Sequence, residues 1–266
     1  MKKIIHNQPI GLFDSGVGGT SIWKEVVKLL PHENTIYLAD SKNAPYGEKT
    51  TEEIIKLSVK NTELLLSKGC KLIIVACNTA TTNAIDFLRK NYSVPFIGIE
   101  PAIKPAALYS KTGAIGILAT KGTLTSKLFA KTANEYTKNI TTIEQDGDGL
   151  VPLIENGQSN SDEMFELLNN YLKPMLNFDI DHLVLGCTHY PYLIPQIKKI
   201  IGNNIQIIDS GEAVARQTKA VLEKNNLLSN TTEKGKHEFY TNINELVLQQ
   251  ILADVNENLS VKKTDF

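Results

Sequence analysis

Short apolar runs alternate with helical patterns along most of the chain. Several of the runs are apolar at nearly every position, which is typical of parallel strands that are buried on both faces. We expect strands at Ile10–Phe13, Thr35–Leu38, Leu72–Ala76, Phe96–Ile99, Ala114–Leu118, Leu183–Leu185 and Ile205–Ile208. Strands that alternate with helices predict a doubly wound α/β fold, in which ligands bind at the carboxyl ends of the strands.

Further elements are predicted between and after these strands. The apolar stripe of Thr51–Leu66 predicts a helix, with a threonine at position 50 or 51 as its N-cap. The polar stretch Thr231–Lys236 predicts an exposed loop. Beyond it we expect a late edge strand at His237–Tyr240 and a closing helix at Glu245–Val255.

The chain also repeats itself loosely, at separations of 105 to 110 residues. Three pairs of segments resemble one another in the same order: Ile10–Asp14 and Ile115–Ala119, Ile73–Thr79 and Leu183–His189, and Ile97–Glu100 and Ile207–Ser210. A single match is weak evidence, because buried strands look alike. The ordered set predicts two pseudo-symmetric, doubly wound α/β domains with mainly parallel sheets.

Composition and charge exclude several classes of protein. The 266 residues include 28 Lys and Arg against 29 Asp and Glu, so the basic excess of a typical nucleic-acid-binding protein is missing. The longest apolar runs, such as Leu72–Cys77, are far shorter than the ~20 residues of a membrane-spanning helix. No secretory pattern follows Met1, and the three cysteines form no Cys-x-x-Cys pair. We therefore expect a cytoplasmic enzyme that binds neither nucleic acid nor membrane.

Two of the cysteines occupy matching places in the repeat. Cys77 and Cys187 each follow a predicted strand and precede polar residues and a predicted helix. A thiol at a helix N-terminus is expected to have its pKa lowered from about 8.5 toward neutrality, which favours the thiolate. A single free cysteine is usually an ordinary buried residue, which is our interpretation of Cys70. The duplication instead favours a chemical role for Cys77 and Cys187.

Two thiols that face each other across a cleft can invert a stereocentre. One removes a proton from one face of a carbon atom, and the other returns a proton to the opposite face. A single nucleophilic cysteine would instead need one dedicated histidine base, as in a hydrolase. The paired arrangement therefore predicts a reversible enzyme that inverts a stereocentre.

Other polar residues near the predicted strand ends suit a small anionic amino acid. Asp14 and Ser15 open a glycine-rich loop that lacks the spacing of a dinucleotide site. Asp14 can pair with an ammonium group, and Ser15 can donate to a carboxylate. The turn at 44–47 is interpreted first as a turn and second as a substrate contact.

A metal site is not expected, although His189 lies two residues from Cys187. Zinc usually needs three or four protein ligands, and the remaining four histidines show no ligand spacing. We interpret Tyr190–Tyr192 as packing residues. The segment Glu155–Gly157 fits either a cleft loop or an exposed turn.

Together these motifs resemble glutamate racemase, of the cofactor-independent Asp/Glu racemase superfamily. The resemblance rests on the Asp-Ser-Gly-Val-Gly-Gly loop, the Pro-Tyr-Gly turn, Ala-Cys-Asn-Thr-Ala and Gly-Cys-Thr-His-Tyr-Pro, and it extends from Gly11 to about Gly211. It implies racemization of L-glutamate to D-glutamate for peptidoglycan, without a cofactor, by a homodimer. It also implies one domain at 1–98 plus 208–266, a second at 99–207, and an active site in the cleft between them.

The resemblance also implies roles for individual residues. Cys77 would deprotonate D-glutamate, Cys187 would deprotonate L-glutamate, and Asp14 and His189 would orient or tune the thiols. Residues that would hold the substrate are Asp14, Ser15, Pro45, Tyr46, Gly47, Asn78, Thr79, Thr188 and His189. The chain departs from the family pattern at Ala39–Ala44 and Gln145–Gly149, which concerns the cleft lining and regulation rather than the reaction.

Three alternatives to this function are kept. An aspartate racemase or a related amino-acid racemase would use the same paired cysteines, and the His189-Tyr190 pair favours glutamate only by resemblance. A catalytically silent amino-acid-binding or regulatory protein is possible because a fold does not establish an activity, although the intact cysteines argue against it. A pyridoxal-phosphate racemase ranks low because no lysine follows a predicted strand in a suitable setting.

Overall fold

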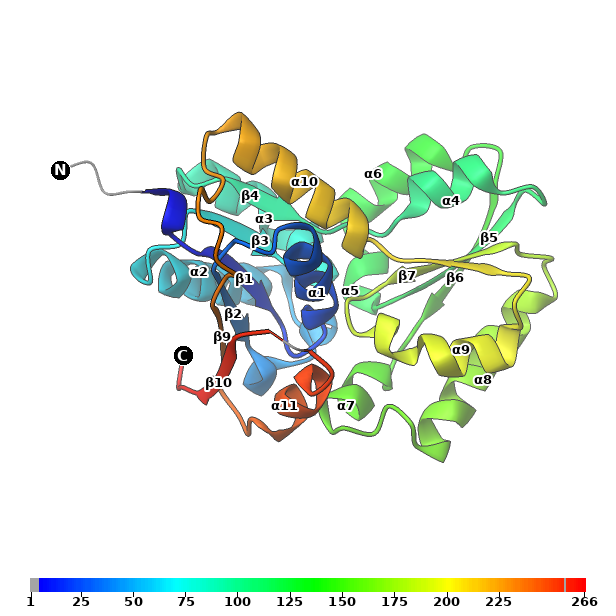
Figure 1. The fold of residues 1–266 in the computed structure, drawn as a ribbon. Helices are drawn as coiled ribbons and strands as arrows, with labels where there is room; N and C mark the ends of the chain where they lie inside the picture. Colours follow the sequence, from blue (N-terminus) through cyan, green and yellow to red (C-terminus); the bar gives the residue numbers. More distant parts are fainter. Residues whose placement is uncertain (1–4, 256) are drawn as a thin grey trace.

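The chain folds into two parallel sheets that are covered by helices on both faces (Figure 1). The structure, a computed structural model, describes residues 5–255 and 257–266. The start of the segment after Met1, for which no secretory pattern is predicted, therefore lies outside the described residues.

The first sheet has six strands in the order β10-β9-β2-β1-β3-β4. Their bounds are β1 (Ile10–Asp14), β2 (Thr35–Ala39), β3 (Leu72–Val75), β4 (Phe96–Gly98), β9 (His237–Thr241) and β10 (Leu259–Lys263). Every pair in the sheet is parallel. Figure 1 shows the C-terminal strands beside the N-terminal ones, so the two ends of the chain share one sheet.

The second sheet has four parallel strands in the order β6-β5-β7-β8. Their bounds are β5 (Ala114–Ala119), β6 (Thr141–Asp146), β7 (His182–Gly186) and β8 (Gln206–Ile208). This order repeats β2-β1-β3-β4 of the first sheet, strand for strand. The predicted fold class, two similar α/β halves with parallel sheets, is confirmed.

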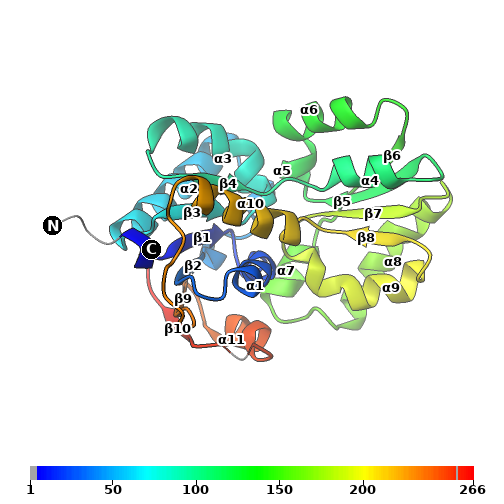
Figure 2. The same cartoon turned by 45° about the horizontal axis from the view of Figure 1, so that its top comes forward.

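Helices cover both faces of each sheet (Figure 2). On the first sheet, α1 and α10 pack on one face and α2 and α3 on the other. On the second sheet, α4 and α6 pack on one face and α8 and α9 on the other. The α-helices are α1 (Thr20–Leu29), α2 (Thr51–Ser67), α3 (Asn78–Asn91), α4 (Ile103–Tyr109), α5 (Lys121–Leu124), α6 (Lys127–Tyr136), α7 (Leu150–Glu155), α8 (Asp162–Leu176), α9 (Ile194–Ile201), α10 (Gly211–Lys224) and α11 (Leu246–Leu252). The 3-10 helices are η1 (Ile5–Asn7), η2 (Ser41–Asn43), η3 (Tyr46–Glu48) and η4 (Tyr190–Leu193).

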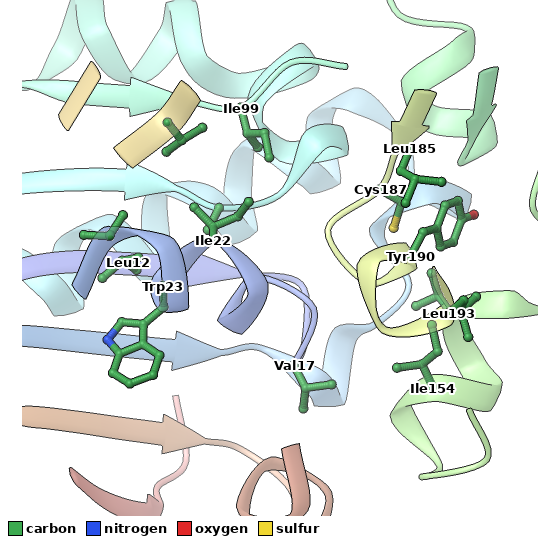
Figure 3. Packing of buried hydrophobic residues seen from close by; sticks show 14 of the residues in the cluster. Leu12, Val17, Ile22, Trp23, Ile99, Ile154, Leu185, Cys187, Tyr190 and Leu193 are labelled. Carbon is green, nitrogen blue, oxygen red and sulfur yellow. The ribbon is translucent and has the colours of Figure 1, made fainter. Parts of the chain in front are cut away.

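Burial on both faces explains why the strands read as uninterrupted apolar runs. In β3, Leu72 and Ile74 join one buried cluster while Ile73 and Val75 join the cluster on the other face. The first of these clusters continues from one sheet to the other. We call each sheet with its covering helices a lobe. Figure 3 shows Val17 of the first lobe near a group of apolar side chains of the second lobe that includes Tyr190. The two lobes therefore share apolar packing beside the site described below.

The predicted strand at His237 and the predicted helix after it are both present, as β9 and α11, but their predicted places at the edge of the sheet and at the end of the chain are wrong. The strand at His237 does not lie at the edge of its sheet, because β9 pairs with β2 on one side and with β10 on the other. The chain does not close with a helix either, because α11 ends at Leu252 and is followed by β10. The segment Leu259–Lys263 has little apolar character, so its pattern did not predict a strand. The predicted loop at 231–236 contains no helix or strand, as expected.

The chain crosses between the two sheets twice, after β4 and after β8. These crossings lie near the predicted domain boundaries, and the boundary at 207/208 falls on the last residue of β8. The division into domains at these positions stays a prediction.

A buried histidine in the first sheet makes the stability of the protein depend on pH. Trp23 Nε1 donates to Thr35 Oγ1 (2.9 Å), and this hydroxyl donates in turn to His237 Nδ1 (2.9 Å). Burial lowers the pKa of His237 to about 4. The unfolded chain therefore binds a proton at a higher pH, near 6.5, than the folded chain does.

We expect the free energy of unfolding to fall as the pH drops from 6.5 to 4. Between these values the unfolded state binds more protons, so acidification favours it, by about 3 kcal/mol at most. Urea unfolding at pH 7 and pH 4.5 measures the difference. In His237→Gln this pH dependence should be smaller, and an equal dependence in both proteins would contradict the assignment.

Candidate active site

Cys77 lies at the junction between β3 and α3. It is the N-cap of α3, and its sulfur accepts a hydrogen bond from the Ala80 N–H (3.4 Å). Its thiol donates to Ser15 Oγ (3.7 Å), and the side chain is almost fully buried. The predicted position at a helix N-terminus is confirmed for this cysteine.

The predicted lowering of the Cys77 pKa is wrong. Burial and the nearby Asp14 carboxylate raise the pKa of the thiol well above its ordinary value. The hydrogen bonds from Ala80 and with Ser15 act in the opposite direction but are the smaller effects. Desolvation of the thiolate therefore outweighs the helix N-terminus, and Cys77 is a neutral thiol in the ligand-free protein.

Cys187 follows β7 but does not cap a helix, so the prediction for this cysteine is wrong in part. The next helical turn, η4, begins only at Tyr190. The contact that distinguishes Cys187 is with His189, whose Nδ1 lies 3.7 Å from the sulfur. The thiol group at this end of the site is thus paired with an imidazole rather than with backbone N–H groups.

His189 is completely enclosed between the two lobes. Burial opposes its charged form, but hydrogen bonds with Cys187 and Glu155 raise the pKa of the imidazole well above its ordinary value. Its Nε2 lies 2.5 Å from Glu155 Oε1, and its Nδ1 lies 4.0 Å from Asp14 Oδ2. These contacts favour an imidazolium, with one N–H directed at the Cys187 sulfur and the other at a carboxylate.

Glu155 lies at the site and contacts both His189 and the glycine-rich loop, in a segment whose sequence fits either a cleft loop or an exposed turn. It ends α7 in the second lobe, and Oε1 accepts from the Val17 N–H (2.6 Å) in the first lobe. Its other oxygen accepts from Ser41 Oγ (2.7 Å). A Cβ atom at Gly16 would lie 1.9 Å from this carboxylate, so any other residue here would displace the Glu155 side chain. The cleft interpretation holds for Glu155, while the two residues after it are exposed.

Asp14 ends β1 and is completely buried. Its carboxylate accepts from the Gly19 N–H (2.8 Å), from Ser15 Oγ (3.5 Å) and from Thr188 Oγ1 (3.4 Å). Burial raises its pKa, although the nearby His189 acts against this. Asp14 is therefore linked to Cys77 through the hydroxyl of Ser15, whereas His189 contacts Cys187 directly.

Both cysteines line one small hollow between the lobes. Other predicted site residues around it are Ser15, Pro45, Tyr46, Gly47, Asn78, Thr79, Thr188 and His189. The hollow has room for about one water molecule (≈ 10 Å³) and adjoins an outer cleft of ≈ 200 Å³. An amino acid can enter only if the lining residues move, so this is a closed state of the site.

Two features of the hollow indicate a polar ligand. Both amide atoms of Asn78 are buried and have no hydrogen-bond partner among the described residues. Such atoms are costly unless a ligand or water satisfies them. Thr79 Oγ1 lies 2.9 Å from Thr120 Oγ1 across the lobes. Hydroxyl and amide groups from both lobes therefore converge on one space.

Three lining or bridging residues were not among the predicted site residues: Thr120, Val151 and Glu155. Thr120 follows β5 as Ser15 follows β1, and the two are 105 residues apart, so the repeat contained a signal for it. Val151 lies in α7, and its sequence context carries no such signal. All the predicted site residues line the hollow except Asp14, which lies behind Ser15 and Thr188.

The family model of the Asp/Glu/Hydantoin racemases matches residues 10–218 of the chain. The chain belongs to this family. The predicted resemblance and the predicted class of enzyme, a racemase, are thereby confirmed.

Several glutamate racemases are similar to this chain over most of its length. The glutamate racemase of Herpetosiphon aurantiacus is 45% identical over 88% of this chain and 92% of its own. The crystal structure of the glutamate racemase isoform RacE1 from Bacillus anthracis has a TM-score of 0.86 at 31% identity, covering 98% of both chains. The Escherichia coli glutamate racemase, solved with L-glutamate and the activator UDP-MurNAc-ala, has a TM-score of 0.85 at 30% identity, covering 97% of this chain and 98% of that chain.

Two further properties of the racemase concern metals and membranes. Within residues 5–255 and 257–266, no three His, Cys, Asp or Glu side chains are grouped so that they could hold a metal ion. Among the described helices, none is long and apolar enough to cross a membrane.

Proposed function

We propose that this protein interconverts L-glutamate and D-glutamate by two-base proton transfer between Cys77 and Cys187, with no metal ion and no organic cofactor. The observation that carries the proposal is that both thiols, from corresponding strand ends of two similar sheets, line one hollow. The similarity to glutamate racemases over most of the chain supports glutamate as the substrate.

The contacts of the two thiols differ. The difference supports a protonation state in which Cys187 is the base and Cys77 is the acid, as the L-to-D direction requires. The positive charge of His189, 3.7 Å from the Cys187 sulfur, favours Cys187 as the base for this direction, while burial keeps Cys77 protonated as the acid. The Cys187 thiolate takes the α-proton of L-glutamate, so the C–H bond breaks and an S–H bond forms. The Cys77 thiol then gives its proton to the opposite face of the carbanion, which yields D-glutamate.

The D-to-L direction requires the reversed state of the pair, with Cys77 as the thiolate that takes the α-proton and Cys187 as the thiol that returns one. Cys187 receives its proton from His189, whose Nδ1 lies 3.7 Å from the sulfur, and Cys77 must pass its own proton on. The Cys77 thiol donates to Ser15 Oγ (3.7 Å), and this hydroxyl donates to Asp14 Oδ1 (3.5 Å). Asp14 has a raised pKa, so its carboxylate can accept a proton that is passed along these contacts. The ammonium group of a bound substrate would further favour the thiolate by its positive charge.

The polar lining of the hollow supports the binding of an amino acid. Asn78 and Thr79 form the first turn of α3, where backbone N–H groups and the helix dipole favour a carboxylate. Ser15 and Thr188 add hydroxyl groups from the two lobes. Aspartate, whose side chain is one methylene shorter, is the alternative substrate that the experiment separates from glutamate.

The test is incubation of metal-stripped protein with L-glutamate and, separately, L-aspartate in D₂O. D-Glutamate that carries deuterium at the α-carbon is the expected product, detected by chiral separation and mass spectrometry. D-Aspartate instead would keep the mechanism and change the substrate. Neither product, from protein that still binds glutamate, would favour the silent binding protein.

On the family resemblance we also propose that the D-glutamate is used for peptidoglycan and that the enzyme acts in the cytoplasm as a homodimer. Light scattering of the purified protein should give twice the mass of one chain. Depletion of the protein in its host should be relieved by external D-glutamate.

A further inference from the structure

A buried polar cluster lies behind one wall of the hollow. The wall is formed by Pro45 and by Tyr46 and Gly47 of η3, which line the space that holds both thiols. The ring of Tyr46 is 1% exposed, and its hydroxyl donates to Asp40 Oδ2 (2.6 Å). Burial and the Asp40 carboxylate raise the pKa of Tyr46 well above its ordinary value, so the phenol is a permanent donor. The position of the wall therefore depends on Asp40.

Asp40 is completely buried and has several partners. Besides Tyr46, its carboxylate accepts from Asn43 Nδ2 (2.8 Å) and Asn242 Nδ2 (2.5 Å), and Lys60 Nζ lies 3.3 Å away. The Asp40 N–H donates to the carbonyl of Asp14 (3.1 Å), directly beside the catalytic strand end. A carboxylate in this position is stable only while its donors stay in place.

Asn242 contributes to this cluster from a distant part of the sequence. It follows β9 in the C-terminal segment, 202 residues from Asp40, and is 3% exposed. Its Oδ1 accepts from the Lys42 N–H (2.8 Å) while its Nδ2 donates to Asp40, so one amide holds both the N-cap of η2 and its middle residue. Nδ2 also lies 3.4 Å from the carbonyl oxygen of Phe266.

We propose that Asn242 is a positioning residue for substrate binding, which acts by fixing Asp40 and, through it, the wall at Tyr46 and Gly47. Asn242 does not line the hollow itself. The proposal rests on the proposed function, because it takes glutamate as the ligand of the hollow. It also gives the C-terminal strands of the first sheet a role at the site.

The test compares Asn242→Ala with Asn244→Ala. Asn244 lies in the same turn but is exposed, and its Oδ1 accepts only from the Leu246 N–H (2.9 Å), so its variant is the matched control. Asn242→Ala is expected to raise KM for glutamate about tenfold while kcat changes less than about threefold. The control should leave both constants unchanged. A KM for Asn242→Ala that equals the control value overturns the proposal, and so does a loss confined to kcat.

Two further variants separate positioning from general loss of structure. Asn242→Asp places two carboxylates together and should raise KM more than the alanine variant. Adding Asp40→Asn restores one amide and one carboxylate, and should recover part of the loss. No recovery, in protein that melts at the wild-type temperature, contradicts the proposal. If Asn242→Ala does not fold, Tyr46→Phe decides, because it removes only the hydroxyl that Asp40 holds: a raised KM supports the proposal and an unchanged KM overturns it.

Binding measured without turnover keeps the two proposals separate. Calorimetric titration of D-glutamate into wild type and Asn242→Ala should show the same tenfold weakening as KM. If the wild type binds glutamate without racemizing it, the proposed function fails while this comparison still tests the role of Asn242.

Discussion

Serine in place of either Cys77 or Cys187 is expected to lower the racemization of glutamate by about a thousandfold. Serine has nearly the shape of cysteine, so the hollow stays intact, but its hydroxyl is a far weaker acid than a thiol. It can neither hold the negative charge of the base nor release a proton as readily. Because racemization needs one proton removed and one returned, the loss of either thiol should stop inversion.

Each variant should keep half of the chemistry. In Cys77→Ser, Cys187 can still remove the α-proton of L-glutamate and return a deuteron to the same face in D₂O. Deuterium should therefore enter L-glutamate without the formation of D-glutamate. In Cys187→Ser the exchange should instead be confined to D-glutamate. Mass spectrometry of each enantiomer measures both exchanges, and this opposite pattern distinguishes two bases from a single one.

Cys70→Ser is the matched control for these variants. Cys70 is buried just before β3, at the opposite end of this strand from Cys77, and burial raises its pKa to about 12. The substitution should lower the stability slightly and leave the turnover at the wild-type rate. Wild-type rates in both Cys77→Ser and Cys187→Ser would disprove the two-base mechanism.

The sequence pattern predicted strands well where both faces are buried and poorly where they are not. The run at Leu72 is apolar throughout because its residues alternate between two cores. By contrast β6 (Thr141–Asp146) is polar and partly exposed, and it was not predicted. The repeat contained the missing information, because β6 is the counterpart of β2 at a separation of 106 residues. A structural repeat thus constrains elements whose own composition does not.

The same contrast applies to the site. Cys77 and Asn78 could be predicted because their surroundings, a strand end and a helix start, are local in sequence. Glu155 could not, because its partners Val17 and Ser41 are 138 and 114 residues away. The direction of the Cys77 pKa shift was missed for a related reason: the helix N-terminus is a local feature, whereas burial depends on the whole fold. Long-range contacts decide how each predicted residue behaves.

Glutamine in place of Glu155 is expected to lower kcat/KM for glutamate by about ten- to a hundredfold near neutral pH. The amide keeps the size of the side chain and can still accept from the Val17 N–H, but it removes the negative charge 2.5 Å from His189 Nε2. The imidazolium beside Cys187 is then less stable, so the positive charge that helps this sulfur to act as the base is weaker. Because the two enantiomers have equal free energies, kcat/KM must fall equally in both directions.

The pH profile identifies the cause of this loss. Activity in the L-to-D direction requires protonated His189, so it declines as the pH rises through the pKa of the imidazole, which the Glu155 contact raises. In Glu155→Gln the decline should move to lower pH, although Asp14, 4.0 Å away, keeps part of the effect. Glu48→Gln, which removes an exposed carboxylate from the outer cleft, is the control and should leave the profile in place. If Glu155→Gln lowered the activity by the same factor at every pH, Glu155 would only hold the two lobes together and would not stabilise the imidazolium of His189.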